Sequence, residues 1–199
     1  MSKEAVLSLR QATGAGIVDI QKALTEANGD EAKAIEILRV RGQAKAAKKQ
    51  DRETKEVIVA SYIHANGRVG AIVELNCETD FVARNEDFKN FAREVAMHIT
   101  AANPLYISPS DVPEEVREKE AQIYKEEMES QGKLKGKTDE MVQKILDGKL
   151  QKYYSDACLL EQTSIKDDGV TIGELLIQLT AKVGEKIVLK RFSRFGLGE

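Results

Sequence analysis

The chain has 199 residues, of which 42% are apolar and 32% charged, a composition typical of a globular protein with one or two domains. Its formal net charge of −3 argues against nucleic acid as a direct partner, because phosphate binding requires a basic surface. The sequence shows neither an apolar N-terminal leader nor a run of ~18 apolar residues, so we expect a cytoplasmic protein with reduced thiols and no membrane partner.

Residues 1–50 are predicted to form a module of three helices. The second helix carries an apolar stripe at helical spacing, made of Ile17, Ile20, Leu24 and Ala27. Asp30 is placed to cap the third helix. The apolar face of that helix is expected at Ala34, Ile35 and Leu38. A core of about 45 residues is marginal, so this module is expected to need support from neighbouring contacts.

Val18 does not fit the apolar stripe of the second helix. It lies about 100° away from the stripe, on the side that carries Gln21, Lys22 and Thr25. An apolar residue on a polar face is either incidentally exposed or a contact point for a partner. Periodicity leaves both interpretations open.

After the helical module the pattern changes. Gly42 interrupts the helical spacing, residues 51–56 predict a linker, and residues 57–199 predict a core domain. Strands are expected near 57–64 and 69–77, joined by Asn66-Gly67, a pair typical of two-residue turns with positive φ. A third strand is expected near 186–192, because a lone hairpin is barely stable.

Helices are predicted between the second and third strands. Residues 85–100 form one of them, with Asn85 as its cap. Its buried face is expected at Phe88, Phe91, Val95 and Ile99. Charged segments near 113–150 predict a helical hairpin, and Lys133, Lys135 and Lys137 lie at its turn. The predicted fold class is therefore α+β, with a helical module and a core built on a small antiparallel sheet.

The stretch from Glu74 to Arg84 is the most informative in the chain. An apolar strand ends there in a polar turn, and Phe81 stands beside Asp80 just before a new helix. Phe81 either fills the protein's own core or projects as a rigid apolar anchor toward a partner. Thr79 or Asp80 is also placed to cap the turn that follows. Periodicity alone favours the core.

The sequence carries no signature for catalysis, for a metal site or for a cofactor. Gly14-Ala15-Gly16 lacks the third glycine and the preceding strand of a dinucleotide site. Cys77 and Cys158 lie far apart, and with two histidines they give no zinc spacing. Cys77 with Asp80 and a histidine supplies the residue types of a thiol enzyme, but a small core residue is the simpler interpretation.

Three segments of the chain resemble signatures of the bacterial elongation factor Ts family. They are residues 9–24, 76–83 and 158–162, and they occur in the order found in the family. The resemblance implies a guanine-nucleotide exchange factor that binds elongation factor Tu, both with GDP and without nucleotide. It implies no covalent chemistry and no cofactor. It also implies that the N-terminal module is similar to ubiquitin-associated domains and that the helical hairpin protrudes.

The resemblance also implies two contact sites. By matching position, Asp80 and Phe81, flanked by Thr79 and Val82, insert between two helices of the GTPase domain of elongation factor Tu. This insertion disturbs its Mg²⁺ and phosphate site. The N-terminal module grips another helix of that domain. The matching positions are Arg10, Ile17, Val18 and Gln21, where Gln21 stands in place of a frequent Lys.

Longer members of the family have two features that we do not expect here, a second half of the core and a C-terminal helical module. A reduced core leaves sheet edges unpaired, and we hypothesise a homodimer formed through the sheet. The alternative functions are a non-catalytic adaptor with a ubiquitin-associated-like module and a thiol enzyme that uses Cys77. An adaptor requires neither the motif at 76–83 nor that at 158–162, and the lack of a catalytic signature disfavours the thiol enzyme.

Overall fold

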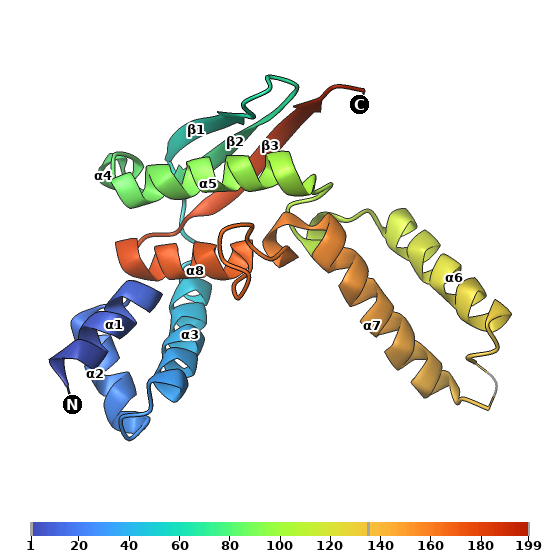
Figure 1. Ribbon diagram of the computed structural model, residues 1–199, viewed down its shortest axis with the longest axis horizontal. Helices are drawn as coiled ribbons and strands as arrows, with labels where there is room; N and C mark the ends of the chain where they lie inside the picture. The colour runs from blue at the N-terminus through green and yellow to red at the C-terminus, as the bar shows by residue number, and fades with distance from the viewer. Residues whose placement is uncertain (1, 135, 199) are drawn as a thin grey trace. The chain divides into compact units, whose positions relative to one another are not determined.

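The computed structural model describes residues 2–134 and 136–198 and confirms an α+β fold with an antiparallel sheet (Figure 1). The chain forms two compact units. One combines Met1–Thr100 with Glu174–Glu199, and the other is Ala101–Gly173. Among the helices of the described residues, none combines the length and the hydrophobicity that crossing a bilayer would need.

The N-terminal module consists of α1 (Lys3–Thr13), α2 (Ile17–Glu26) and α3 (Glu31–Ala47). Gly14 adopts φ 64° after α1, a left-handed conformation that glycine takes at little cost. The Asp30 side chain accepts a hydrogen bond from the Lys33 N–H at 3.1 Å, which confirms it as the cap of α3. The buried core of the module is made of Leu9, Ile20, Ala23, Leu24, Ala27, Ala34 and Leu38.

Three sequence predictions for this module were wrong. Ile17 is exposed because it is the first residue of α2 and lies at the end of the stripe rather than within it. Ile35 is also exposed, and Ile37 packs against the core instead. Gly42 does not interrupt the helix: α3 continues through it to Ala47, and Gly42 is buried where a Cβ would lie 3.5 Å from Ile177.

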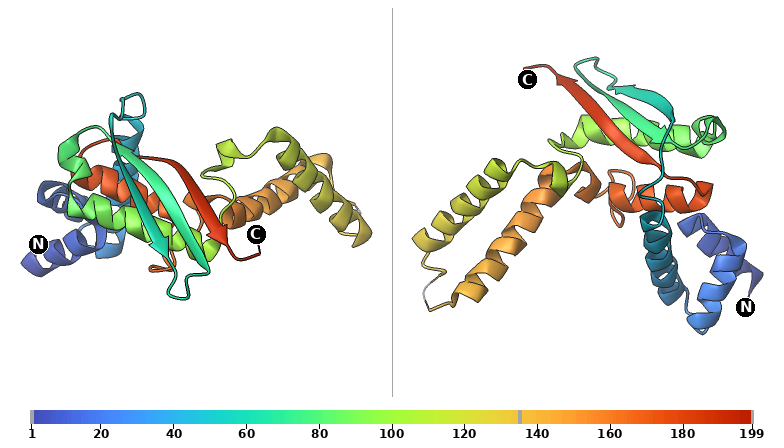
Figure 2. Two further views of the ribbon diagram at one scale, coloured as in Figure 1. Left: turned by 90° about the horizontal axis from the view of Figure 1, so that it is seen from above. Right: turned by 180° about the vertical axis from the view of Figure 1, so that it is seen from behind.

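The sheet has the strand order β1 (Glu56–Ile63), β2 (Val69–Cys77) and β3 (Val188–Gly196), all antiparallel. Helix α5 (Glu86–Ala102) lies across one face of this sheet (Figure 2). The predicted face of α5 is confirmed, since all of its members are buried: Phe88, Phe91, Val95 and Ile99. Asn85 accepts a hydrogen bond from the Asp87 N–H at 2.8 Å and caps α5 as expected.

The β1–β2 connection differs from the predicted two-residue turn. The His64 N–H donates to the Val69 carbonyl at 2.9 Å, and the Gly67 N–H donates to the His64 carbonyl at 2.7 Å. Gly67 has φ 66°, whereas Asn66 has no positive φ. The Asn66 side chain instead accepts the Arg68 N–H at 3.0 Å, which stabilises a longer loop.

The second unit contains a helical hairpin of α6 (Glu114–Ser130) and α7 (Asp139–Ala157). Its base is a cluster of Val112, Tyr154 and Cys158, with Tyr106 packed against it. Helix α7 continues beyond the predicted end at residue 150, because Tyr154 and Ala157 extend its buried face. Of the lysines predicted at the hairpin turn, Lys135 lies outside the described residues.

Candidate functional site

The motif at 76–83 forms a sharp passage from strand to helix. β2 ends at Cys77, and the single-turn helix α4 (Asp80–Ala83) follows after Thr79, its N-cap residue. The Ala83 N–H donates to the Thr79 carbonyl at 3.2 Å, and the Arg84 N–H donates to the Asp80 carbonyl at 3.0 Å. An isolated helical turn is unstable, so α4 depends on contacts with the rest of the protein.

Phe81 and Val82 are neighbours on α4 with opposite environments. Phe81 is 82% exposed, whereas Val82 is 7% exposed and belongs to the core. The alternative that periodicity alone favoured, with Phe81 in the protein's own core, is therefore wrong, and the ring projects outward. Since Val82 faces inward, it anchors α4 rather than offering an apolar surface to a partner. Phe81 is left as a projecting ring whose burial elsewhere would remove a large apolar area from water.

The side chain of Asp80, the residue before Phe81, is half-exposed. Its Oδ2 atom lies 3.0 Å from Nη2 of Arg84, one helical turn further on. The Arg84 side chain is itself exposed, and such pairs are weak because water competes for both charges. Asp80 can therefore exchange Arg84 for a polar group of a partner at little cost.

Two carboxylates hold the turn before α4. Glu185, in the loop after α8 (Ile172–Val183), accepts hydrogen bonds from the Glu78 N–H at 3.2 Å and from the Thr79 N–H at 3.0 Å. The Thr79 hydroxyl also donates to Glu185, at 2.6 Å. In return, Glu78 accepts the Lys186 N–H at 2.5 Å. Sequence reasoning missed Glu185, because nothing local marks a partner more than a hundred residues away.

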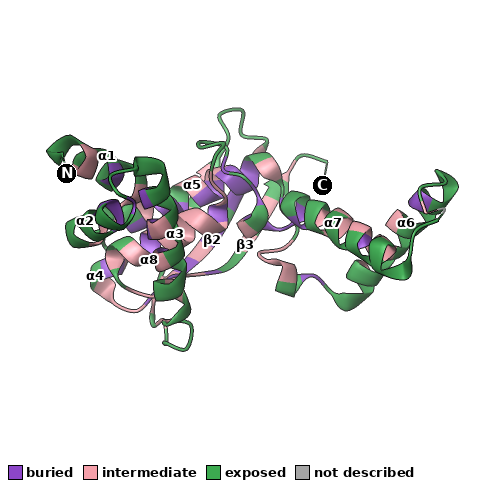
Figure 3. Cartoon of the chain, turned by 90° about the horizontal axis from the view of Figure 1, so that it is seen from below, coloured by how far each residue is buried: buried purple, intermediate pink, exposed green. Residues whose placement is uncertain are grey.

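The four residues predicted to grip a partner helix lie at the end of α1 and in the first half of α2. All four are exposed: Arg10, Ile17, Val18 and Gln21. Figure 3 colours much of the ribbon of α1 and α2 as exposed. Gln21 lies four residues after Ile17 and three after Val18, so these side chains share one side of α2. Val18 is 61% exposed, which leaves an apolar contact point free on that side.

The thiol of Cys77 is poorly suited to nucleophilic chemistry. It is fully buried, and its Sγ donates to the Thr79 carbonyl at 3.3 Å. Burial raises the pKa of Cys77 to about 11, which disfavours the reactive thiolate. Burial likewise raises the pKa of Cys158 to about 11. Within 2–134 and 136–198, no group of three or more His, Cys, Asp and Glu side chains is arranged to hold a metal ion.

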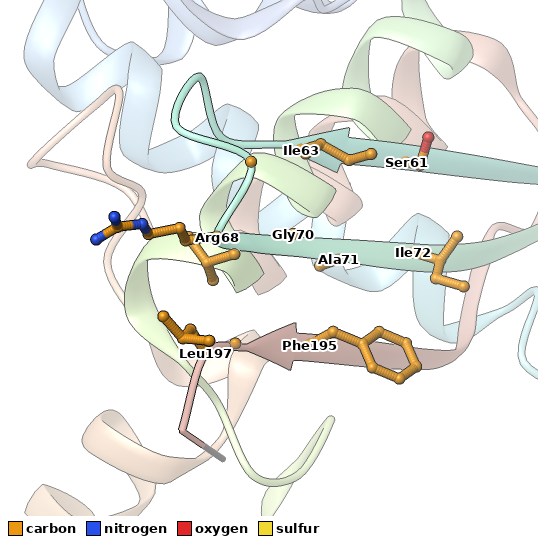
Figure 4. Close-up of a pocket in the computed structure, with 11 residues that line it drawn as sticks. Ser61, Ile63, Arg68, Gly70, Ala71, Ile72, Phe195 and Leu197 are labelled. Carbon is orange, nitrogen blue, oxygen red and sulfur yellow. The ribbon is translucent and has the colours of Figure 1, made fainter.

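A second exposed surface covers the face of the sheet opposite α5, and we call it the outer sheet face. Its exposed apolar residues are Val57, Val59, Ile63, Ile72 and Phe195. Gly70 pairs with Ile63 on one side and with Phe195 on the other, as Figure 4 shows. A Cβ at Gly70 would lie 2.8 Å from the Tyr62 carbonyl oxygen, so no side chain fits there. The result is a hollow of about 580 Å³ between two projecting apolar side chains.

Comparison with known proteins gives a consistent result over the whole chain. The family model described as Elongation factor TS matches residues 9–199. Elongation factor Ts of Desulfosudis oleivorans is 50% identical over 199 residues, covering 100% of this chain and 98% of the relative. That of Fervidobacterium nodosum is 50% identical and covers 100% and 99%, and that of Caldanaerobacter subterraneus subsp. tengcongensis is 51% identical and covers 100% and 98%. The chain therefore belongs to the elongation factor Ts family.

Proposed function

We propose that this chain binds elongation factor Tu in the cytoplasm and promotes the release of its GDP, without covalent chemistry of its own. The observation that carries the proposal is the 82% exposure of Phe81, beside Asp80, in a motif that resembles the family's second signature. A large aromatic ring held out on a short anchored helix is suited to insertion into another protein.

Exchange of this kind requires only binding. The exchange factor weakens the partner's affinity for GDP by the same ratio by which GDP weakens the partner's affinity for the exchange factor, because coupling between two ligands is reciprocal. Mg²⁺ in the partner's nucleotide site demands near-ideal geometry, so a small displacement by Phe81 and Asp80 would loosen the nucleotide. Thr79 and Val82 support this contact from within the chain. The buried thiols take no part in it.

The test is the release of a fluorescent GDP analogue from elongation factor Tu. Excess unlabelled GDP is added to occupy each nucleotide site of elongation factor Tu that loses the labelled analogue. The chain should accelerate this release at sub-stoichiometric concentration. Absence of acceleration by the folded chain would refute the exchange function. Binding to elongation factor Tu without acceleration would instead support the adaptor alternative.

Val18→Asp is expected to weaken binding to GDP-bound elongation factor Tu about tenfold, because a charge replaces an apolar contact of the N-terminal module. The side chain is 61% exposed, so the free energy of unfolding should change by less than about 0.5 kcal/mol. Isothermal titration calorimetry gives the affinity and urea denaturation the stability. Val40→Asp is the matched control, since Val40 is 64% exposed on α3 and outside the predicted contact. Equal losses in both variants would contradict a contact at Val18.

We further propose that a second copy of the chain covers the outer sheet face. The hollow at Gly70 and the projecting ring of Phe195 lie on the same face, as a two-fold symmetric interface requires. Contiguous exposed apolar residues of this kind can mark a protein–protein contact. The structure thus favours pairing through a face of the sheet rather than through its edges.

Ile63→Asp should convert the proposed dimer into a monomer, because each interface would acquire two buried charges. Light scattering at micromolar concentration should give twice the chain mass of 22.0 kDa for the unmodified chain and for Val40→Asp. The Ile63→Asp chain should give the single mass. A monomeric mass for the unmodified chain would rule out this interface.

A further inference from the structure

The turn that presents Asp80 and Phe81 is held by a residue outside the motif. Glu185 uses both of its carboxylate oxygens: Oε2 accepts the Glu78 and Thr79 N–H groups at 3.2 and 3.0 Å, and Oε1 accepts the Thr79 hydroxyl at 2.6 Å. Hydrogen bonds to an ionised carboxylate are shorter and stronger than those between neutral groups. Both polar groups that Thr79 can donate are therefore committed to one side chain.

Residues next to Thr79 and Glu185 form a second link, in which the carboxylate belongs to Glu78 and the N–H donor to Lys186. Glu78 accepts the Lys186 N–H at 2.5 Å, and Nη1 of Arg52 lies 3.3 Å from its carboxylate. The Lys186 N–H bond, with support from Arg52, holds the pKa of the Glu78 carboxyl below its usual range. Lys186 in turn donates through Nζ to the carbonyls of Gln50 and Arg52. The loops at 78–79 and 185–186 are thus joined by two carboxylates that cross between them.

The hydrogen bonds of Glu185 act directly on α4, the helix that carries Phe81. Thr79 is the N-cap residue of α4, with φ −130° and ψ 158°, and its side chain makes no capping hydrogen bond. Its hydroxyl is used by Glu185 instead. Since α4 has only four residues, the backbone angles of Thr79 help to set the direction in which the Phe81 side chain points away from the protein. Glu185 fixes the turn before Phe81, and the buried Val82 fixes the residue after it.

We propose that Glu185 is a positioning residue for the Asp80-Phe81 contact, holding Phe81 in one orientation before the partner arrives. Preorganisation raises affinity because the ordering cost has been met before binding. This inference rests on the proposed exchange function and adds to it a residue that lies outside residues 76–83. If Glu185 only joined β3 to the end of β2, its removal would lower stability without a specific effect through Phe81.

Local motion at position 81 gives a test that needs no partner. The chain contains no Trp, so Phe81→Trp introduces a single fluorescent reporter. Time-resolved anisotropy should show faster local motion of this Trp when Glu185→Ala is added. Glu185→Gln should leave the motion unchanged, because its amide oxygen can accept both N–H groups and its NH₂ can donate to the Thr79 hydroxyl. Unchanged motion in folded Glu185→Ala would overturn the proposal.

A double-mutant cycle tests the functional consequence. Glu185→Ala should slow GDP release on the order of fivefold, as residues within one network couple, and Glu185→Gln should restore it. In the Phe81→Ala background, Glu185→Ala should cause no further loss. Independent, multiplicative losses would overturn the proposal. If circular dichroism shows Glu185→Ala unfolded, Glu185→Asp replaces it, since a side chain shorter by one methylene cannot reach all three donors.

The two assays separate failure of this inference from failure of the proposed function. If the unmodified chain does not accelerate GDP release, the exchange function is refuted, while anisotropy still decides whether Glu185 orders residue 81. If the chain is active and Phe81→Ala is impaired, but Glu185→Ala behaves as the unmodified chain in both assays, only the positioning role is refuted.

Discussion

Phe81→Ala is expected to slow the release of GDP from elongation factor Tu by about 10- to 100-fold. The ring is 82% exposed in the free chain, and its burial in a partner would contribute about 1.5–3 kcal/mol. The substitution removes that contribution from the complex with nucleotide-free elongation factor Tu, so GDP release is slowed. Stopped-flow fluorescence with labelled GDP, over a range of chain concentrations, separates a loss of maximal rate from a loss of affinity.

Leu105→Ala is a suitable control for this experiment. Leu105 is also a large exposed apolar side chain, but it belongs to the second unit and lies outside both predicted contacts. The control should retain the full exchange rate. If Phe81→Ala kept full activity, the ring would have no role in exchange. If both variants lost activity equally, the effect would not be specific to the motif.

Phe88→Ala should have the largest effect on stability. The Phe88 side chain, on α5, is fully buried, and truncating such a side chain to alanine typically costs about 3–5 kcal/mol of unfolding free energy. A loss of this size is a large fraction of the stability of an ordinary domain. Urea denaturation followed by circular dichroism measures it, and the midpoint should fall with little change in slope.

Phe81→Ala provides the matched control for Phe88→Ala, because it removes the same kind of ring from an exposed position, seven residues earlier in the chain. With Phe81 exposed, its removal should change the unfolding free energy by less than about 0.5 kcal/mol. The two variants should therefore separate function from folding. A comparable loss of stability in both would mean that Phe81 packs in solution, contrary to the structure.

Local features of the fold followed from the sequence where short-range physics decides. The face of α5 is a 3.6-residue period of large apolar side chains, and every predicted member is buried. Asp30 and Asn85 cap their helices because a short polar side chain reaches an N–H within the next turn.

Predictions failed where another contact, or the end of an element, overrides the expected pattern. Asn66-Gly67 is a strong signal for a two-residue turn, yet the Asn66 side chain bonds to the Arg68 N–H and the loop is longer. Gly42 lowers helix propensity, but its burial near Ile177 keeps α3 intact. Ile17 matches the stripe of α2 but lies at its first position, where no neighbouring turn covers it.

By itself, the sequence determined the approximate places of the helices and strands and the motif that indicates the family, because periodicity, caps and signatures are local. Only the tertiary structure decided the direction of Phe81, since that depends on Val82 entering the core and on Glu185 holding Thr79. Residues 79 and 185 meet because α8 and β3 return the chain to the end of β2. A contact of that kind depends on the packing of whole elements, which no local pattern encodes.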